Sequence, residues 1–330
     1  MPRDPLAELR DQLLGRLSKV WGYDPKNQAS LIVPDELRDH VNAVQTASLP
    51  ERIVEEIVDK LDSIDDTLTE MGDDESGTLP LIARLRPRGH TEDDWTARPS
   101  DNRPWPVILV HGTGDTQGVY QEMARELRAD GWAVFAPGYG ERATRPLQES
   151  AHNVGEYISA VLKQTGAEKA IVVGHSQGGL VVRYWMRFHG GAAKVHHLVC
   201  LATPNHGTTM GGVLSPLIKS KIAEELVDSL VSSWFGPAGF QQVVGSPIIE
   251  ALNDGGDLDE EVHGYTCIAT RSDSVIQPPE TCFLKGENVR NLWVQDLEPR
   301  AVILHEDMPR DKRVRRLVMA TLRAVALQQP

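Results

Sequence analysis

The chain has 330 residues, of which 40% are hydrophobic, so it is long enough to form one large core together with an accessory segment. Its formal net charge of -13 argues against nucleic acid as a partner, because phosphate binding requires a basic face. The same charge disfavours strong electrostatic docking to anionic membranes, although a transient contact with lipid interfaces is left open. No stretch of the sequence approaches the length that a membrane-spanning helix needs.

The N-terminus and the cysteines bear on the cellular location of the protein and on the cofactors that it could bind. The start of the chain lacks a basic region followed by an apolar core, so it predicts no secretion signal and a cytoplasmic location, provided that Met1 is the native start. Cys200 lies in an apolar run, and Cys267 and Cys282 flank a polar loop and could pair, but an odd cysteine count favours reduced thiols. No zinc-ligand spacing and no Gly-x-Gly-x-x-Gly after a strand occur, so we expect no metal and no cofactor.

Residues 1–95 differ in pattern from the rest and are predicted to form an acidic helical segment followed by a linker. Apolar residues recur at alternating spacings of three and four in the stretch 50–71, and acidic residues cover its other faces. Residues 84–106 are rich in Pro, Arg and Asp, as linkers often are. Packing on the main domain is the simplest role for the helices, and binding a protein partner, self-association or acting as a lid are the alternatives.

From residue 96 to residue 330 the sequence predicts a second, larger domain, in which strands and helices alternate from residue 106 onward. Short apolar runs separated by helical patterns predict a parallel sheet with helices on both faces. Ligands of such sheets bind at the carboxyl ends of the strands. The predicted strands are 107–110, 132–136, 170–173, 195–201, 265–270 and 292–294, and the predicted helices include 119–129, 154–162 and 180–188.

The stretch after the strand 170–173 carries the strongest chemical signal. It reads Gly174-His175-Ser176-Gln177-Gly178, which fits Gly-x-Ser-x-Gly, and a helical pattern follows it. Strand, sharp turn and helix in that order form the context of a nucleophile elbow, in which the serine hydroxyl is exposed at the tip of a strained turn. The turn also directs the backbone N–H of Gln177 toward an oxygen that becomes negative during reaction.

A glycine-containing loop at the end of the first strand predicts the other half of an oxyanion site. The strand 107–110 runs into His111-Gly112-Thr113-Gly114, where glycines allow the backbone to approach a substrate oxygen closely. Thr113 can supply a backbone N–H, and its hydroxyl can add a second donor. Together with the Gln177 N–H it would form an oxyanion hole. An ordinary strand-to-helix turn is the alternative.

A serine nucleophile needs a base and an orienting carboxylate, which follow it along the chain in the order acid, then histidine. His305 is the only histidine after the acid candidates in the last third of the chain, so we expect it to be the general base. Asp273 lies just past the strand 265–270, where a carboxylate can reach a histidine at the strand ends. Asp296, at the end of the strand 292–294, is the main rival.

Residues 205–261 interrupt the alternation and are predicted to form a cap or pocket-wall insertion. Apolar residues recur every four positions in its first half, which predicts a helix with a broad apolar face. The face is equally suited to packing on the core and to walling an acyl pocket or moving as a lid. The repeat consists of Ile218, Ile222, Leu226, Leu230 and Trp234.

These motifs together resemble the lipases of the α/β-hydrolase fold, both the bacterial class 2 triacylglycerol lipases and Candida lipase B. The similarity runs from Pro106 to His305 and includes the oxyanion stretch 106–116 and the elbow stretch 176–181. Residues 240–247 and 251–256 resemble the pocket wall of the Candida enzyme, and 269–278 resembles its acid loop. The resemblance implies an α/β-hydrolase domain, with the N-terminal helical segment and the cap insertion as additions.

The resemblance also implies roles for single residues. It implies Ser176, His305 and Asp273 as the catalytic triad, in agreement with the reading of chain order, and Thr113 and Gln177 as the oxyanion residues. It further implies that Asn205 and Gln242 line the acyl side of the pocket and that Val275 faces the substrate. His175 stands where the Candida enzyme has tryptophan, so we expect the alcohol side of the pocket to differ in shape and polarity. 

The sequence thus predicts a serine carboxylic-ester hydrolase, a lipase or esterase, that forms an acyl-enzyme on esters with an apolar acyl chain. An acyltransferase with the same triad is one alternative, since the acyl group can pass to an alcohol instead of water. A non-catalytic scaffold that holds a partner through the N-terminal helices is the other alternative.

Overall fold

A computed structural model describes residues 79–84, 86–209 and 235–328 of the chain. Within them a six-stranded sheet has the order β2-β1-β3-β4-β5-β6, and every pair of neighbouring strands is parallel. The strands are β1 (Val107–Val110), β2 (Val134–Phe135), β3 (Ala170–His175), β4 (Val195–Leu201), β5 (Gly264–Ala269) and β6 (Val289–Trp293). The six predicted strands are therefore present, and the prediction of a parallel sheet is confirmed.

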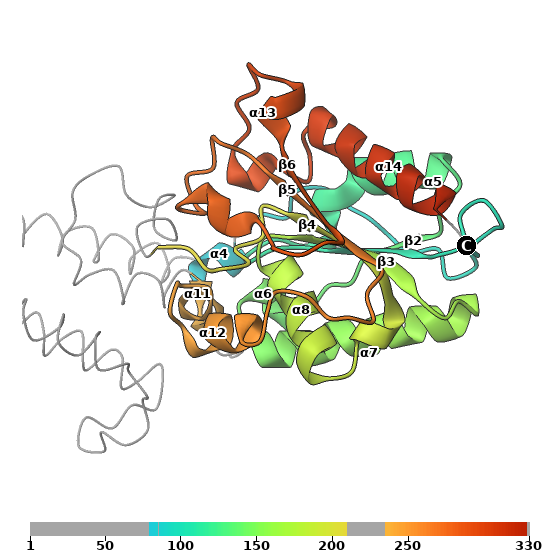
Figure 1. Ribbon diagram of the computed structural model, residues 1–330. Helices are drawn as coiled ribbons and strands as arrows, with labels where there is room; N and C mark the ends of the chain where they lie inside the picture. Colours follow the sequence, from blue (N-terminus) through green and yellow to red (C-terminus); the bar gives the residue numbers. More distant parts are fainter. Residues whose placement is uncertain (1–78, 85, 210–234, 329–330) are drawn as a thin grey trace, which may run out of the picture. The chain divides into compact units, whose positions relative to one another are not determined.

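Helices cover both faces of this sheet. Figure 1 shows α7 (Leu147–Thr165) and α8 (Gln177–Phe188) below it, and α5 (Gln121–Ala129) and α14 (Lys312–Leu327) above it. The shorter described helices are α4 (Leu81–Arg84), α6 (Gly140–Ala143), α11 (Pro237–Gln241), α12 (Pro247–Asn253) and α13 (Val294–Leu297). Parallel strands connected by helices require this arrangement, because each crossover returns over one face of the sheet.

The central strands are apolar throughout because both of their faces are buried. In β1, Ile108 and Val110 point into the core between the sheet and helices α7 and α8, whereas Val107 and Leu109 point into the core between the sheet and helices α5 and α14. All four side chains are completely buried. The edge strand β6 is only partly buried, and two of its residues are exposed. The sheet is thus a rigid support on which the loops at its carboxyl edge are held.

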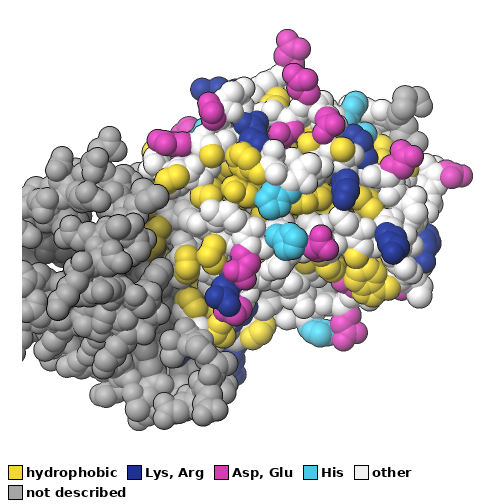
Figure 2. Space-filling view, turned by 90° about the horizontal axis from the view of Figure 1, so that it is seen from below, with side chains coloured by type: hydrophobic (Ala, Val, Ile, Leu, Met, Phe, Trp, Pro, Cys, Tyr) yellow, Lys and Arg dark blue, Asp and Glu magenta, His cyan; other side chains and the backbone are white. Residues whose placement is uncertain are grey.

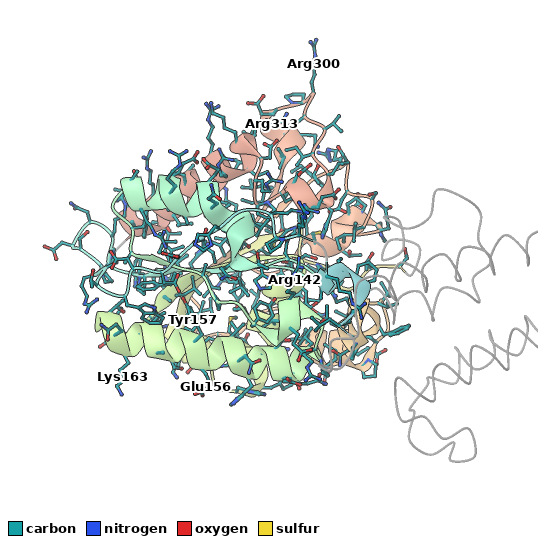
Figure 3. All side chains as sticks on the ribbon, turned by 180° about the vertical axis from the view of Figure 1, so that it is seen from behind. Arg142, Glu156, Tyr157, Lys163, Arg300 and Arg313 are labelled. Atoms are coloured by element: carbon teal, nitrogen blue, oxygen red, sulfur yellow. The ribbon has the colours of Figure 1, made fainter. Side chains whose placement is uncertain are left out.

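The helix after β2 begins earlier than its apolar pattern predicts. The pattern predicts a helix over 154–162, but α7 spans Leu147–Thr165 and ends at Gly166, which adopts a left-handed conformation with φ 74°. Its first turn buries Leu147, but the buried residues between Leu147 and Val154 are the small Ser150 and Ala151, so the apolar repeat on which the prediction relied is interrupted there. In Figure 3, Glu156 and Lys163 point outward from α7, whereas Tyr157 turns toward the sheet layer.

Residues 79–95, which the sequence analysis grouped with the N-terminal segment, belong to the same compact unit as the sheet. The side chain of Asp93 explains part of this attachment. Its carboxylate accepts hydrogen bonds from the Tyr157 hydroxyl on α7 and, at 2.9 Å, from the backbone N–H of Ala136 after β2. Trp95 packs its ring against Phe135, with 5.5 Å between the ring centroids. This part of the predicted linker is therefore bound to the sheet domain.

Two predictions fall outside the described residues. These are the N-terminal helices before residue 79 and the apolar repeat between Ile218 and Trp234. The described part of the insertion contains α11 and α12. The apolar residues of α12 pack into the core on the side of the sheet that α7 and α8 cover. Among the described helices none is long and apolar enough to cross a membrane. Figure 2 shows acidic and basic side chains dispersed over the face that carries α7 and α8.

Candidate active site

Ser176 occupies a strained turn between β3 and α8. Its backbone has φ 51° and ψ −127°, and it directly precedes the first residue of α8. A non-glycine residue with positive φ is unfavourable by about 1–3 kcal/mol and persists only where the surroundings enforce it. The serine is buried, with 7% of its surface exposed. This is the strand–turn–helix geometry that the pentapeptide predicts.

Glycines on either side make the turn sterically feasible. A Cβ atom at Gly178 would lie 2.3 Å from the carbonyl oxygen of Val110, and one at Gly174 would lie 2.6 Å from the backbone nitrogen of Gly179. Both obstacles are backbone atoms, which cannot move aside as a flexible side chain can. A Cβ at Gly112 would come within 2.9 Å of the Ser176 Cβ. These three positions therefore require glycine for steric reasons.

His305 provides a ring nitrogen beside the serine hydroxyl. Its Nε2 lies 2.9 Å from Ser176 Oγ, and the residue opens a 3₁₀ turn, His305–Asp307, that precedes α14. The Thr270 hydroxyl donates to the carbonyl of Ile303 at 3.2 Å, and the Arg88 guanidinium donates to the carbonyl of Glu306 at 3.2 Å. These two hydrogen bonds hold the loop that carries His305, one before and one after this residue. The contact with Arg88 could not be predicted from sequence patterns, because it joins residues 218 positions apart.

Asp273 provides the carboxylate on the other side of the ring. Its Oδ2 lies 2.8 Å from His305 Nδ1 and accepts a hydrogen bond from the N–H at this nitrogen. Its Oδ1 accepts hydrogen bonds from the backbone N–H groups of Val275 and Ile276, at 2.9 and 2.8 Å. Asp273 is 4% exposed, and hydrogen bonds hold both oxygens of its carboxylate. With Nδ1 protonated, Nε2 presents its lone pair to the serine hydroxyl.

The rival acid lies elsewhere. Asp296 is in α13 and pairs with the guanidinium of Arg271 at 2.6 Å, and about half of each side chain is exposed. Its carboxylate therefore forms a surface ion pair and shares no hydrogen bond with His305. 

Thr113 and Gln177 lie together, as predicted for the two halves of an oxyanion site. The Thr113 hydroxyl donates to the side-chain oxygen of Gln177. Within the described residues, neither of their backbone N–H groups donates to a protein acceptor, so both are available to a ligand oxygen. Gln242 Nε2 donates to Thr113 Oγ1 and to Gln177 Oε1, each at 3.2 Å, and to the Ala238 carbonyl at 3.1 Å. Gln242, which belongs to the insertion, thus holds the side chains of Thr113 and Gln177 in place.

Comparison with known proteins agrees with this geometry. Residues 106–229 match the family model described as the alpha/beta hydrolase fold. A solved structure, Aspergillus fumigatus lipase B, superposes with a TM-score of 0.55 at 19% identity and covers 68% of this chain and 54% of its own. The chain has the α/β-hydrolase fold. The fold class expected from the sequence is confirmed.

Two curated relatives are lipases by name. Lipase B of Pseudozyma antarctica is 27% identical over 179 residues, which are 52% of this chain and 47% of the relative. A triacylglycerol lipase of Pseudarthrobacter phenanthrenivorans is 28% identical over 127 residues, which are 35% of this chain and 38% of the relative. The chain thus spans less than half the length of either curated relative. The resemblance to lipases drawn from the motifs is confirmed.

In this α/β-hydrolase domain, Asn205 lies apart from the oxyanion residues. Its side chain is completely buried and donates through Nδ2 to the carbonyl of Cys282 at 2.6 Å. Its backbone carbonyl accepts from the buried guanidinium of Arg183 at 3.1 Å. It shares no hydrogen bond with Ser176, Thr113 or Gln242 among the described contacts. Its side chain connects strand-end loops in the structure, and its predicted place on the acyl wall remains a prediction.

Val275 and His175 lie beside the triad. The Val275 N–H donates to Asp273, and its carbonyl accepts from the Thr208 hydroxyl at 2.7 Å, which connects the acid loop to the start of the insertion. His175 is 3% exposed, and its ring centroid lies 4.9 Å from that of His305. Burial, followed by the nearby His305, holds the pKa of His175 well below its usual value. His175 is therefore neutral at pH 7.

The cysteines of the α/β-hydrolase domain form no disulfide bond among the described residues. Cys200, Cys267 and Cys282 are free and buried, so Cys267 and Cys282 are not paired with each other. Cys200 and Cys267 are opposite one another in the register of β4 and β5. Over residues 79–84, 86–209 and 235–328, no three His, Cys, Asp or Glu side chains are grouped so that they could hold a metal ion.

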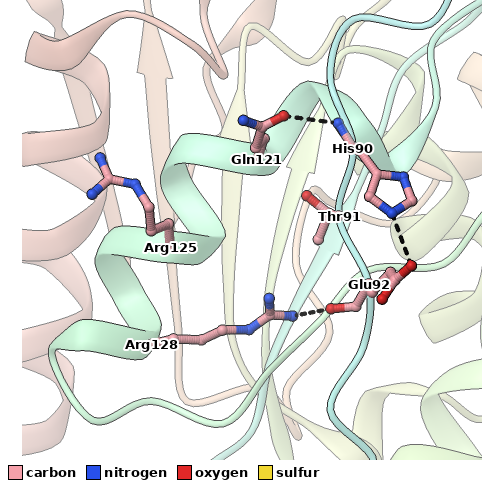
Figure 4. A pocket seen from close by; sticks show the side chains of 6 residues that line it. All are labelled: His90, Thr91, Glu92, Gln121, Arg125 and Arg128. Carbon is pink, nitrogen blue, oxygen red and sulfur yellow. Dashed lines mark hydrogen bonds and ion pairs between the residues drawn. The ribbon is translucent and has the colours of Figure 1, made fainter.

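An open pocket of about 420 Å³ lies on another part of the domain (Figure 4). Its polar groups are largely paired with one another. The His90 ring contacts the Glu92 carboxylate at 3.0 Å, and Arg128 donates to the Glu92 carbonyl at 2.8 Å. It contains none of the strand-end residues around Ser176. The lining residues are His90, Thr91, Glu92, Gln121, Arg125 and Arg128.

Proposed function

We propose that this chain is a serine carboxylic-ester hydrolase that acts on esters with an apolar acyl chain. The observation that carries the proposal is the continuous series of contacts from Ser176 Oγ through the His305 ring to Asp273, with distances of 2.9 and 2.8 Å. Two free backbone N–H groups lie beside this serine. The names of the two relatives, a lipase B and a triacylglycerol lipase, support the ester class and an apolar acyl group.

In the first half of the proposed reaction, Ser176 Oγ attacks the carbonyl carbon of the ester while His305 Nε2 takes the hydroxyl proton. The carbonyl oxygen becomes negative in the tetrahedral intermediate. The backbone N–H groups of Thr113 and Gln177 donate to it. The intermediate collapses by breaking the bond to the alcohol oxygen, and His305 returns its proton to that oxygen. An alcohol leaves, and the acyl group remains as an ester of Ser176.

In the second half, water replaces the alcohol. His305 Nε2 removes a proton from the water, whose oxygen attacks the acyl carbon, and the same N–H groups stabilise the second tetrahedral intermediate. Its collapse breaks the bond to Ser176 Oγ, which recovers its proton from His305. Asp273 stays ionised throughout and stabilises the imidazolium that forms in each half.

The test is hydrolysis of p-nitrophenyl esters from acetate to palmitate by the full chain. We expect release of p-nitrophenol by the wild type and its loss, by at least about 10³-fold, in Ser176→Ala. Turnover that is equal in the two proteins would refute the proposal. An added alcohol distinguishes hydrolysis from acyl transfer, because a transferase would form the new ester in preference to the free acid.

A further inference from the structure

The imidazole of His175 contacts the main chain of the proposed general base. Its Nε2 lies 3.0 Å from the carbonyl oxygen of His305. A carbonyl oxygen only accepts hydrogen bonds, so Nε2 must carry the proton and donate it. His175 precedes the proposed nucleophile, and it thus connects the elbow directly to the loop that carries the base.

The hydrogen bond through Nε2 is the main polar contact of the His175 ring among the described residues. The Nδ1 atom of His175 is buried and has no hydrogen-bond partner within the described residues. The ring packs closely against the loop after β1, since a Cβ at Gly112 would lie 3.2 Å from Nδ1. An apolar side chain would fill this space without burying an unsatisfied nitrogen, which costs free energy. The hydrogen bond to His305 is therefore the specific contribution of the imidazole.

The His305 carbonyl has little other support. It accepts one further backbone hydrogen bond, from the Met308 N–H at a long 3.3 Å. The hydrogen bonds from Thr270 and Arg88 reach the carbonyls of Ile303 and Glu306, on either side of it. The hydrogen bond from His175 is thus the shorter of the two that hold the carbonyl of His305 itself, on which the direction of its side chain depends.

We infer that His175 is a positioning residue, which holds the His305 backbone so that its ring stays aligned between Ser176 and Asp273. The inference rests on the proposed function, and it assigns to His175 a role beyond shaping the alcohol side of a pocket. Alignment matters because proton transfer requires both ring nitrogens to remain within hydrogen-bond distance of their partners. A neutral ring also adds no positive charge beside the imidazolium that forms on His305.

Two nearly isosteric substitutions separate the hydrogen bond from the shape of the side chain. His175→Gln retains an N–H donor at similar reach, whereas His175→Leu removes it. We expect His175→Leu to lower kcat by about 10- to 100-fold with little change in KM, and His175→Gln to stay within about threefold of the wild type. His152→Leu on the exposed side of α7 is the control for loss of a histidine, and we expect it to leave kcat unchanged.

Nuclear magnetic resonance of the His305 Nδ1 proton tests the positioning without any reaction. We expect a downfield signal, protected by Asp273, in the wild type and in His175→Gln, and its broadening by solvent exchange in His175→Leu. Equal kcat values and equal signals in the two variants, or a change in KM alone, would overturn the inference. If the signals differ as expected but the wild type hydrolyses no ester, the proposed function fails and the positioning role stands.

Discussion

Ser176 Oγ and His305 Nε2 lie 2.9 Å apart, although the two residues are 129 positions apart in the chain. The parallel sheet is the reason. Ser176 follows the carboxyl end of β3, and the 301–304 segment before His305 is attached to Thr270, directly after β5. Because all six strands run in the same direction, loops from distant parts of the sequence converge at one edge. The proposed chemistry therefore depends on the sheet as much as on the motif.

The acid is tested by a pair of matched substitutions. We expect Asp273→Asn to lower kcat by about 10⁴-fold, because an amide at this position no longer favours the His305 tautomer with a proton on Nδ1. Asp296→Asn should change kcat less than about threefold, since Asp296 forms an exposed ion pair with Arg271. Steady-state kinetics on one p-nitrophenyl ester measures both. A larger loss in Asp296→Asn than in Asp273→Asn would show that the acid is misassigned.

Chain order and strand ends were sufficient to nominate these residues, and the structure places Ser176, His305 and Asp273 in contact. Apolar runs located the strands well, because strands buried on both faces are apolar throughout. The start of α7 was missed, since the buried residues between Leu147 and Val154 are the small Ser150 and Ala151, which leave a gap in the apolar repeat. Contacts of His175 with a main-chain carbonyl leave no trace in composition or spacing.

The position of Gln242 was likewise beyond the reach of periodicity, because its contact with Thr113 joins residues 129 positions apart. We expect Gln242→Leu to lower kcat by about tenfold, because the Thr113 hydroxyl and the Gln177 amide lose their common donor. Its neighbour Gln241 is the control. The Gln241 side chain accepts from the Leu147 N–H at 2.7 Å, so Gln241→Leu should lower Tm but preserve kcat. Equal kcat losses would count against a specific role for Gln242.

The elbow glycines give a prediction on stability. A Cβ at Gly178 would lie 2.3 Å from the Val110 carbonyl oxygen, so Gly178→Ala should lower the free energy of unfolding by about 3 kcal/mol or more. Gly131 has a φ of 89° but no atom near its Cβ position. Gly131→Ala should therefore cost only about 1–2 kcal/mol, from backbone strain. Urea unfolding compares the two, and similar losses would contradict the steric argument.

The buried histidine His197, in β4, predicts that the stability of the fold decreases at acid pH. His197 donates to or accepts from the Thr266 hydroxyl at 3.0 Å, and burial lowers its pKa to about 3, below its ordinary 6.5. As the pH falls below 6.5, the unfolded chain therefore binds a proton that the folded chain does not bind until about pH 3. The stabilisation is complete above pH 6.5 and is lost as the pH falls toward 3, at up to about 1.4 kcal/mol per pH unit.

Urea unfolding between pH 7 and pH 4.5 measures this slope. His197→Gln removes one titrating ring and should make the dependence of the unfolding free energy on pH less steep, although other buried histidines such as His175 contribute to the remaining slope. His152→Gln removes an exposed histidine and should leave the slope unchanged. An unchanged slope in His197→Gln would show that burial of this ring does not contribute to acid sensitivity.

The most direct test of the central claim is covalent labelling with a fluorophosphonate, followed by mass spectrometry of the peptides. The strained turn and the His305 ring should make Ser176 nucleophilic, so we predict one adduct per chain, mapped to Ser176. The adduct should be absent in Ser176→Ala and should form at least about 10³-fold more slowly in His305→Ala. An unlabelled wild-type chain, or an adduct on another residue that persists in Ser176→Ala, would contradict the account.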